Sequence, residues 1–216
     1  MIPICIINGN GFIFDVEHYK ILRERHHICG VLTGVLPRYP QQNVFMGLPL
    51  QLCSEETKYL VENGICYLVD DTERHEGYYA TYHSPKQDEH EEPSTQVLVV
   101  STIPERKAEG TGQLRELRYL EPDMKSYKMF KNLVDSGMYC MPGVRFGCQF
   151  LAYPGDPLRY HAHFNARGLE WEEEFPVLDI VGSGRLATAV KKSWVVGASD
   201  QNGAYHCFSV QWAGFG

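Results

Sequence analysis

The chain has 216 residues, of which 44% are apolar and 22% charged, so it can bury a substantial core, and global disorder is excluded. No apolar run approaches the roughly 20 residues of a membrane-spanning helix, and the run over residues 2–8 lacks the length and the basic flank of a signal peptide. Seven cysteines, none in a Cys-x-x-Cys pair, argue against a secreted disulfide framework and against a zinc knuckle. The sequence indicates a soluble, intracellular protein that stays reduced.

The net charge of −7 is concentrated in one segment. Residues 70–94 hold eight acidic and two basic side chains, so they carry −6 of the total. Residues 141–216 hold six basic and seven acidic side chains, and three of these acids form the run Glu172–Glu174. A local basic site is therefore compatible with the acidic total, although no stripe suited to a polyanion is visible.

Residues 1–103 are predicted to form a small mixed α/β domain. Its first expected elements are two strands within 2–15 and a helix over 16–28, with Gly30 as the signal that stops it. Turns and short extended pieces over 31–53, a helix after Ser54 and a strand over 65–70 are expected to follow. The first two strands flank Asn8-Gly9-Asn10-Gly11, a combination typical of tight hairpins. Ser54 is the expected N-cap, because its hydroxyl can accept a hydrogen bond from the first turn.

The middle of the chain predicts a connection between two domains. Residues 71–94 are acidic and polar, contain two prolines, and predict a surface loop or linker that belongs to the first domain. A further strand of that domain is expected at 96–103. Residues 104–114 are the expected junction, so the second domain covers 115–216.

The second domain is expected to be strand-rich. Its predicted elements are a helix near 122–136 closed by Gly137, strands at 143–153 and 159–166, a helix over 176–190, and strands at 191–198 and 204–213. Helices interleaved with strands predict an α/β (α+β) fold class, with a mixed sheet flanked by helices. The last strand is a plausible sheet edge for pairing with a partner chain.

The segment FLAYPGDPLRYHAHF, residues 150–164, is the most informative for chemistry. Its Pro-Gly-Asp-Pro sequence at 154–157 predicts a tight turn between two antiparallel strands. Such a hairpin brings Tyr153 and His161 to the same end of a sheet. Side chains alternate along a strand, so one polar face, able to line a cleft, is expected to carry His161, His163 and Asn165.

A lysine pair, Lys191-Lys192, opens a later predicted strand and supplies a cation for the same kind of site. Tyrosine, histidine and lysine together suit cleavage of RNA by its own 2′-hydroxyl. That reaction needs a base for the hydroxyl, an acid for the leaving 5′-oxygen and a cation for the charge on the phosphorane. None of these three roles requires a metal ion.

Other interpretations of these residues stay open on spacing alone. Two histidines at i and i+2 can ligate a metal, but no third ligand is evident near His161 and His163. They also suit a solvated sheet face, and Lys191-Lys192 a solvated strand edge. Gly182-Ser183-Gly184 lacks the flanking pattern of a phosphate loop, and Glu172–Glu174 lacks the acid-x-lysine arrangement of a metal-dependent nuclease.

Three separated segments carry a family resemblance. Phe146–Pro157 with Arg159–Phe164 resembles the core motif of the catalytic subunits of tRNA-splicing endonucleases, and Gly184–Ser193 resembles their lysine motif. The Pro-Gly-Asp-Pro turn and the closing Gln211-Trp212-Ala213 resemble the eukaryotic 34-type subunits, which cut the 3′ splice site. Three further segments resemble the N-terminal domain of those subunits: Leu36–Arg38, Gln41–Val44 and Gly47–Leu50. The resemblance implies a tRNA-intron-endonuclease-like fold for 115–216.

The resemblance also implies a catalytic triad. Carried over by motif, it consists of Tyr153, His161 and Lys192. Tyr153 is expected to be the general base on the 2′-hydroxyl, His161 the general acid at the leaving oxygen and Lys192 the cation, although the roles of the tyrosine and the histidine can be exchanged. Four further residues are expected to contact the substrate: Arg159, His163, Arg185 and Lys191.

What the chain works with is likewise implied by the resemblance. The expected substrate is precursor tRNA, the expected products are a 2′,3′-cyclic phosphate and a 5′-hydroxyl, and no metal or cofactor is expected. The expected partners are a second catalytic subunit and two structural subunits in a heterotetramer, working in the nucleus without a membrane. The alternative is a non-catalytic structural or RNA-binding subunit of the same complex, which should lack a member of the triad; this chain has all three.

Overall fold

The computed structural model describes residues 1–35, 47–70 and 119–213. The acidic segment 71–94, the expected strand at 96–103 and the expected junction at 104–114 lie outside these residues, so the domain boundaries stay a prediction. In the described part of the chain, no helix has the length and apolarity needed to cross a membrane.

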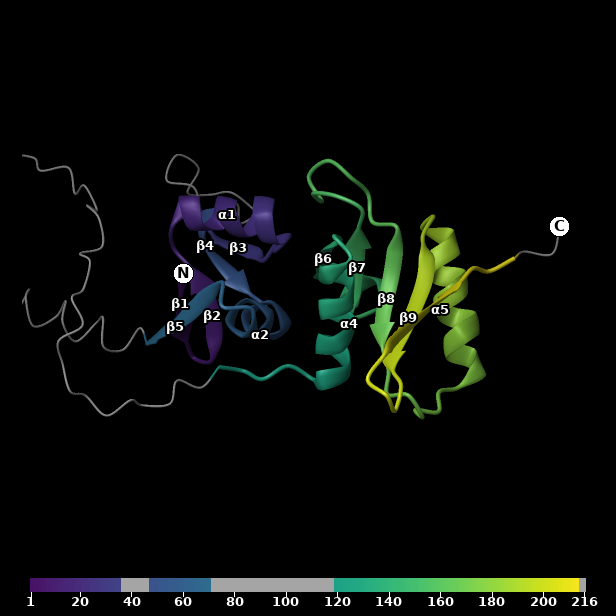
Figure 1. Ribbon diagram of the computed structural model, residues 1–216. Coiled ribbons are helices and arrows are strands. Elements are labelled where there is room, and N and C mark those ends of the chain that lie inside the picture. Colours follow the sequence, from purple (N-terminus) through teal and green to yellow (C-terminus); the bar gives the residue numbers. More distant parts are fainter. Residues whose placement is uncertain (36–46, 71–118, 214–216) are drawn as a thin grey trace, which may run out of the picture.

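The first sheet is mixed, and its five strands lie in the order β3-β4-β2-β1-β5. β1 and β5 run parallel, whereas the other neighbouring strands are antiparallel. Two helices, α1 and α2, complete this half (Figure 1). The bounds are β1 Ile2–Ile7, β2 Asn10–Ile13, α1 Val16–His26, β3 Val31–Gly34, β4 Gly47–Leu52, α2 Ser54–Glu62 and β5 Cys66–Asp70.

Local signals in this half place the elements well and their ends less well. The predicted hairpin is confirmed, because Asn8 and Gly9 both have the positive φ angles that its tight turn needs. Helix α1 ends at His26 rather than at 28, since His27 is left-handed and its N–H bonds to the carbonyl of Leu22. The N-cap of α2 is Cys53 rather than Ser54: the Cys53 N–H donates to the Glu56 carboxylate at 2.9 Å.

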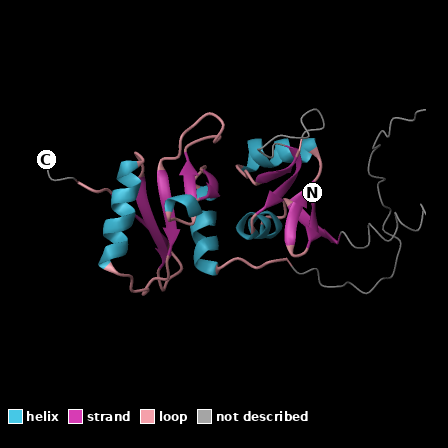
Figure 2. Cartoon of the chain, turned by 180° about the vertical axis from the view of Figure 1, so that it is seen from behind, coloured by secondary structure: helices cyan, strands magenta, loops and turns pink. Residues whose placement is uncertain are grey.

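The second sheet is also mixed, with the order β10-β9-β8-β7-β6. Helices α4 and α5 lie on its two opposite faces (Figures 1 and 2). β8 and β9 run parallel and the other pairs antiparallel. The bounds are α4 Met124–Asp135, β6 Tyr139–Pro142, β7 Phe150–Tyr153, β8 Phe164–Gly168, α5 Val177–Ala189, β9 Ser193–Ser199 and β10 Tyr205–Val210. These two mixed sheets with their helices confirm the predicted α/β fold class.

Two predicted strands of this half are wrong in extent. The strand expected at 143–153 is interrupted, because Val144–Phe146 forms one 3-10 turn and Gly147 is left-handed; only β7 remains, and β6 was not predicted. The strand expected at 159–166 begins only at Phe164, so both histidines precede it. The last strand is an edge of the described sheet, as predicted.

Helix α4 packs the second sheet against the first half of the chain. The ring of Phe130 lies 6.0 Å from that of Tyr59 on α2 and 5.5 Å from that of Phe150 on β7. Polar contacts add to this packing: Ser126 donates to Glu55 at 2.7 Å, Tyr59 donates to Asp135 at 2.9 Å, and Tyr127 donates to Glu62. One apolar cluster therefore contains residues of both sheets.

The contact of α4 with β8 depends on Gly168, and we expect Gly168→Ala to be destabilising. A Cβ there would lie 2.1 Å from the carbonyl oxygen of Lys125, so the helix would have to move away. Overpacking of this kind costs about 1–3 kcal/mol, measurable as a lower thermal unfolding midpoint of the full chain. The matched control is Gly182→Ala on α5, where a Cβ meets nothing within 4 Å. Equal midpoints for Gly168→Ala and the unsubstituted chain would contradict this account.

Candidate active site

Three of the predicted site residues lie at one end of the second sheet. In the antiparallel pair of β7 and β8, Ala152 is opposite Phe164, and in the parallel pair of β8 and β9, Phe164 is opposite the first residue of β9. The next positions outward are Tyr153, His163 and Lys192. The His163 N–H donates to the carbonyl of Ala152 at 2.9 Å, which continues the pairing past the strand end. The register thus brings these three residues to the same end of the sheet, Tyr153 as the last residue of β7 and the other two directly before β8 and β9.

Tyr153 is half-buried at the end of β7. It packs against a small apolar cluster, called here the loop cluster, formed by Cys148, Leu151 and Ala162 with Phe146 and Tyr153 at its border. Burial raises the pKa of the Tyr153 phenol above its ordinary value. The phenol is therefore protonated at neutral pH, and its use as a base would depend on a small phenolate fraction.

His161 is exposed in the loop before β8. Its neighbour Ala162 is buried in the loop cluster and anchors the chain between the two histidines. The predicted polar face is wrong at its third position: Asn165 is only 1% exposed, because β8 is the middle strand of the sheet, between β7 and β9. His163 is exposed, and its ring meets that of Phe164 edge-on at 6.2 Å.

Lys192 lies where the chain returns from α5 to the sheet. Its N–H donates to the carbonyl of Ala187 at 2.8 Å, and the preceding Lys191 has a positive φ, so the chain reverses between helix and strand. The Lys192 ammonium donates to the carbonyl of Val190 at 3.3 Å and lies 5.0 Å from the ring centre of Phe146. Phe146 borders the loop cluster, so Lys192 and Tyr153 flank the same group of side chains.

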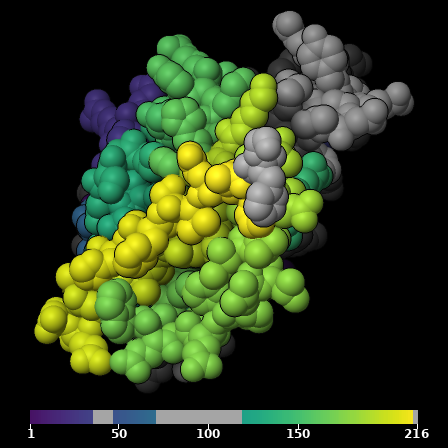
Figure 3. All heavy atoms as spheres, turned by 90° about the vertical axis from the view of Figure 1, so that its right-hand side faces the viewer, coloured from purple at the N-terminus to yellow at the C-terminus, as the bar shows by residue number. Residues whose placement is uncertain are grey.

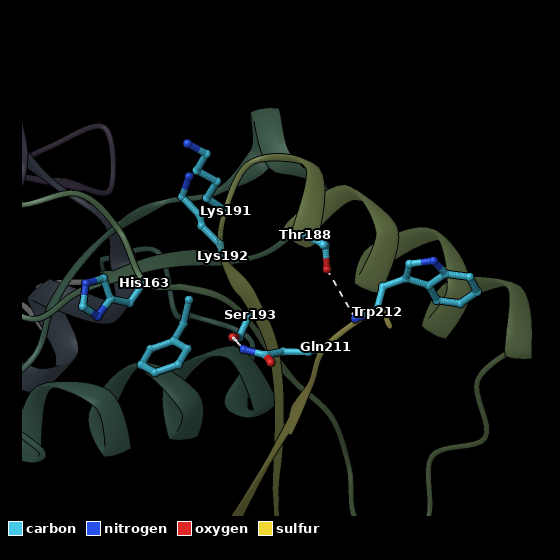
Figure 4. Close-up of a pocket in the computed structure, with 8 residues that line it drawn as sticks. His163, Thr188, Lys191, Lys192, Ser193, Gln211 and Trp212 are labelled. Carbon is cyan, nitrogen blue, oxygen red and sulfur yellow. Dashed lines mark hydrogen bonds between the residues drawn. The ribbon is translucent and has the colours of Figure 1, made fainter. Parts of the chain in front are cut away.

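A surface pocket of about 420 Å³ opens at this edge (Figure 4). Its far wall is fixed by two hydrogen bonds, from Gln211 to the Ser193 hydroxyl at 2.7 Å and from the Trp212 N–H to the Thr188 hydroxyl at 3.3 Å. Figure 4 shows the two lysines where the chain leaves α5, and His163 on the side away from Trp212. The lining residues are His163, Phe164, Thr188, Lys191, Lys192, Ser193, Gln211 and Trp212.

The pocket gathers only some of the residues predicted from the sequence. His163, Lys191 and Lys192 line it, and their charges and donors suit an anionic group such as a phosphate. Tyr153 stands outside that lining, beside the loop cluster, and His161 and Arg159 lie exposed in the loop between β7 and β8. Arg185 is exposed on α5 and also outside the lining.

The sequence did not point to several residues that shape this region. Ser193, Thr188 and Gln211 line the pocket through polar side chains, and only the closing Gln-Trp-Ala string carried a signal, as a family motif. The ion pair between Arg23 and Asp156 joins positions far apart in the chain, so no local sequence pattern predicts it. Among the described residues no three His, Cys, Asp or Glu side chains come together as a metal site.

Comparison with known proteins covers both halves of the chain. Residues 2–71 match the family model "TSEN34-like, N-terminal domain", and residues 124–210 match "tRNA intron endonuclease, catalytic C-terminal domain". The chain is 37% identical to "Probable tRNA-splicing endonuclease subunit sen34" of Schizosaccharomyces pombe, over 99% of this chain and 98% of the relative.

Two more distant relatives agree over nearly their whole lengths. The chain is 29% identical to the subunit SEN34 of Saccharomyces cerevisiae, over 94% of this chain and 98% of the relative. It is 24% identical to the human subunit Sen34, over 99% of both chains. These matches confirm the resemblance noted from the motifs: the chain belongs to the Sen34 family of tRNA-splicing endonuclease subunits.

Proposed function

We propose that this chain cuts precursor tRNA at the 3′ splice site, by attack of the neighbouring 2′-hydroxyl on the scissile phosphate. The products are a 2′,3′-cyclic phosphate and a 5′-hydroxyl, and the reaction needs no metal ion. The match to the catalytic domain of tRNA intron endonucleases supports endonuclease activity. The observation that carries the proposal is the register that lines up Tyr153, His163 and Lys192 at one sheet edge, with His161 two residues away.

Each triad residue has a role that its position suits. Tyr153, held against the loop cluster, takes the proton of the 2′-hydroxyl, and His161, exposed in the loop before β8, gives a proton to the leaving 5′-oxygen. Lys192 stabilises the additional negative charge of the phosphorane. It is a compact cation whose main chain is fixed by the turn after α5.

The exposed basic and hydrogen-bonding side chains around this end of the sheet suit the flanking phosphates. Lys191 and His163 line the pocket beside Lys192, and Arg159 and Arg185 stand on the loop and on α5 nearby in the chain. We assign these four residues to substrate binding. Their small number agrees with a subunit that shares the RNA with partner chains, because this chain has no basic stripe of its own.

The proposed partners are a second catalytic subunit and two structural subunits, assembled in the nucleus. β10 supports such an assembly, because it is an edge of the described sheet and its main chain can pair with a further strand. Figure 3 shows this strand running across the face beside α5. Most of its side chains are exposed, which leaves the strand accessible in the chain taken alone.

The proposal is tested by replacing Lys192 in a reconstituted complex that cuts precursor tRNA at both sites. In chelator, Lys192→Ala is expected to slow the 3′ cut by about 10²–10³-fold, because one donor to the transition-state charge is lost. The 5′ cut and the cyclic-phosphate ends of its products should be unchanged. Lys20→Ala, which removes an exposed lysine on α1, is the matched control. Equal cutting at both sites by Lys192→Ala would place the chemistry in another chain.

A further inference from the structure

The turn between Tyr153 and His161 is held by the other half of the protein. Arg23 on α1 donates two hydrogen bonds to the carboxylate of Asp156, from Nε at 2.8 Å and from Nη2 at 2.7 Å. Asp156 is the third residue of the Pro-Gly-Asp-Pro turn. The two views of the fold agree that the β7–β8 loop extends toward α1 (Figures 1 and 2). The two partners are 133 positions apart in the sequence.

The ion pair is built for a fixed geometry. The Arg23 side chain is 14% exposed and that of Asp156 27%, so solvent screens the pair only in part. The same guanidinium also donates through Nη1 to the Tyr19 hydroxyl at 2.9 Å, which fixes it from its own helix. Arg23 holds the pKa of Asp156 down to about 2, so the carboxylate stays ionised at any pH used for RNA cleavage.

Asp156 also organises the loop that leads to His161. Its carboxylate accepts a hydrogen bond from the Leu158 N–H at 2.8 Å, and its carbonyl accepts from the N–H groups of Arg159 and Tyr160. The Tyr160 ring packs so closely on Gly155 that a Cβ there would lie 2.7 Å from it. A group that fixes Asp156 therefore fixes the whole turn rather than one side chain.

A second contact of α1 lies on the other side of Tyr153. His27, the left-handed residue directly after α1, places its ring 4.6 Å from the ring of Tyr139. Tyr139 is the cross-strand neighbour of Tyr153 in the pairing of β6 with β7. The C-terminal end of α1 thus contacts both the strand beside Tyr153 and the turn that follows it.

We propose that Arg23 is a positioning residue for the 3′-site reaction. Through Asp156 it fixes the loop that carries His161, and with it the position of His161 relative to Tyr153. This proposal rests on the proposed function of the triad. It assigns to the first half of the chain a part in catalysis that requires no contact with RNA. The bidentate pair fixes both the distance and the orientation of the turn, which a single flexible contact would not do.

The test uses Arg23→Met and Arg23→Lys in the reconstituted complex, with single-turnover rate constants for both cuts. Arg23→Met is expected to slow the 3′ cut by roughly 10- to 100-fold, in keeping with the cost of a small misplacement of reacting groups. Affinity for precursor tRNA and the 5′ cut should not change, and Arg23→Lys should restore only part of the rate, because lysine cannot form the fork. The 3′ pH–rate profile should move down in parallel, because the ordinary pKa of an aspartate, about 4, lies below the assay range even when Arg23 is absent.

A matched control and a double variant separate positioning from folding. Arg167→Met removes another arginine–aspartate pair of the second sheet, with Asp179, and should leave the ratio of the two cuts unchanged. Asp156→Asn keeps an acceptor for the Leu158 N–H, and its combination with Arg23→Met should be no slower than the slower single variant.

Three results would overturn the proposal: an unchanged 3′ rate in Arg23→Met, an equal loss at both sites, or fully additive losses in the double variant. Each is distinguishable from a failure of the proposed function by His161→Ala in the same complex. If that variant loses the 3′ cut while Arg23→Met does not, only the role of Arg23 is refuted.

Discussion

Replacement of His161 by alanine is expected to lower the rate constant of the 3′ cut by about 10²–10⁴-fold, the usual contribution of one general acid. The 5′ cut in the same complex should be unchanged, because it is assigned to the proposed second catalytic subunit. His161 is exposed, and the fold beneath it is anchored by its buried neighbour Ala162, so the substitution removes the imidazole without opening the core. The measurement is single-turnover cleavage of end-labelled precursor tRNA.

A sulfur atom in place of the leaving 5′-oxygen separates the role of acid from that of base. A thiolate leaves without a proton, so a variant that lacks only the general acid should cut this substrate nearly as fast as the unsubstituted chain. We therefore expect the sulfur substrate to rescue His161→Ala. His18→Ala on α1 is the control for loss of a histidine. Absence of rescue would assign His161 to the base or to substrate contact instead.

Replacement of Tyr153 by phenylalanine is expected to slow the 3′ cut by about 10²-fold or more, because the proposed base for the 2′-hydroxyl is lost. The ring remains, so its packing against the loop cluster is kept. The sulfur substrate should not rescue this variant. Tyr67→Phe, at an exposed tyrosine of β5, is the control for loss of a hydroxyl.

The pH dependence of the cleavage rate of the sulfur substrate tests whether Tyr153 is the base. Burial raises the pKa of the Tyr153 phenol, so the phenolate fraction grows through the whole neutral range. The rate of the unsubstituted complex should then rise about tenfold per pH unit up to pH ~9. A histidine base would instead give a rate that levels off once the imidazole is neutral, near pH ~7. A plateau there, together with rescue of Tyr153→Phe, would exchange the two roles.

The elements that could be predicted are those whose signals are local. Asn8 and Gly9 predict the first hairpin, and the apolar periodicity before Gly137 predicts α4. Both ends of α4 lie within two residues of the expected positions. The break between β6 and β7 could not be predicted in the same way. It depends on a left-handed Gly147 inside a run that alternates like a strand.

The site was predicted by motif more than by geometry. Tyr153 at the end of β7 and Lys192 directly before β9 come to the same end of the sheet because β8, which lies between these two strands, pairs in parallel with β9, and no hairpin signal predicts this pairing. Asn165 shares the polar alternation of the histidines, but it is buried because β8 is the middle strand of the sheet. The pairing of Arg23 with Asp156 arises only when the two halves pack, so it has no counterpart in the sequence pattern.

The apolar cluster that spans both sheets has a consequence for how the protein unfolds. Because Phe130 packs on α2 and on β7 at once, heat or denaturant should unfold the two described sheets in one cooperative transition. The lifetime of the catalytic centre is then set by the whole cluster, including residues such as Ile4 in β1. A destabilising substitution far from any RNA would lower the amount of active complex in a cell without changing the chemistry of the molecules that remain folded.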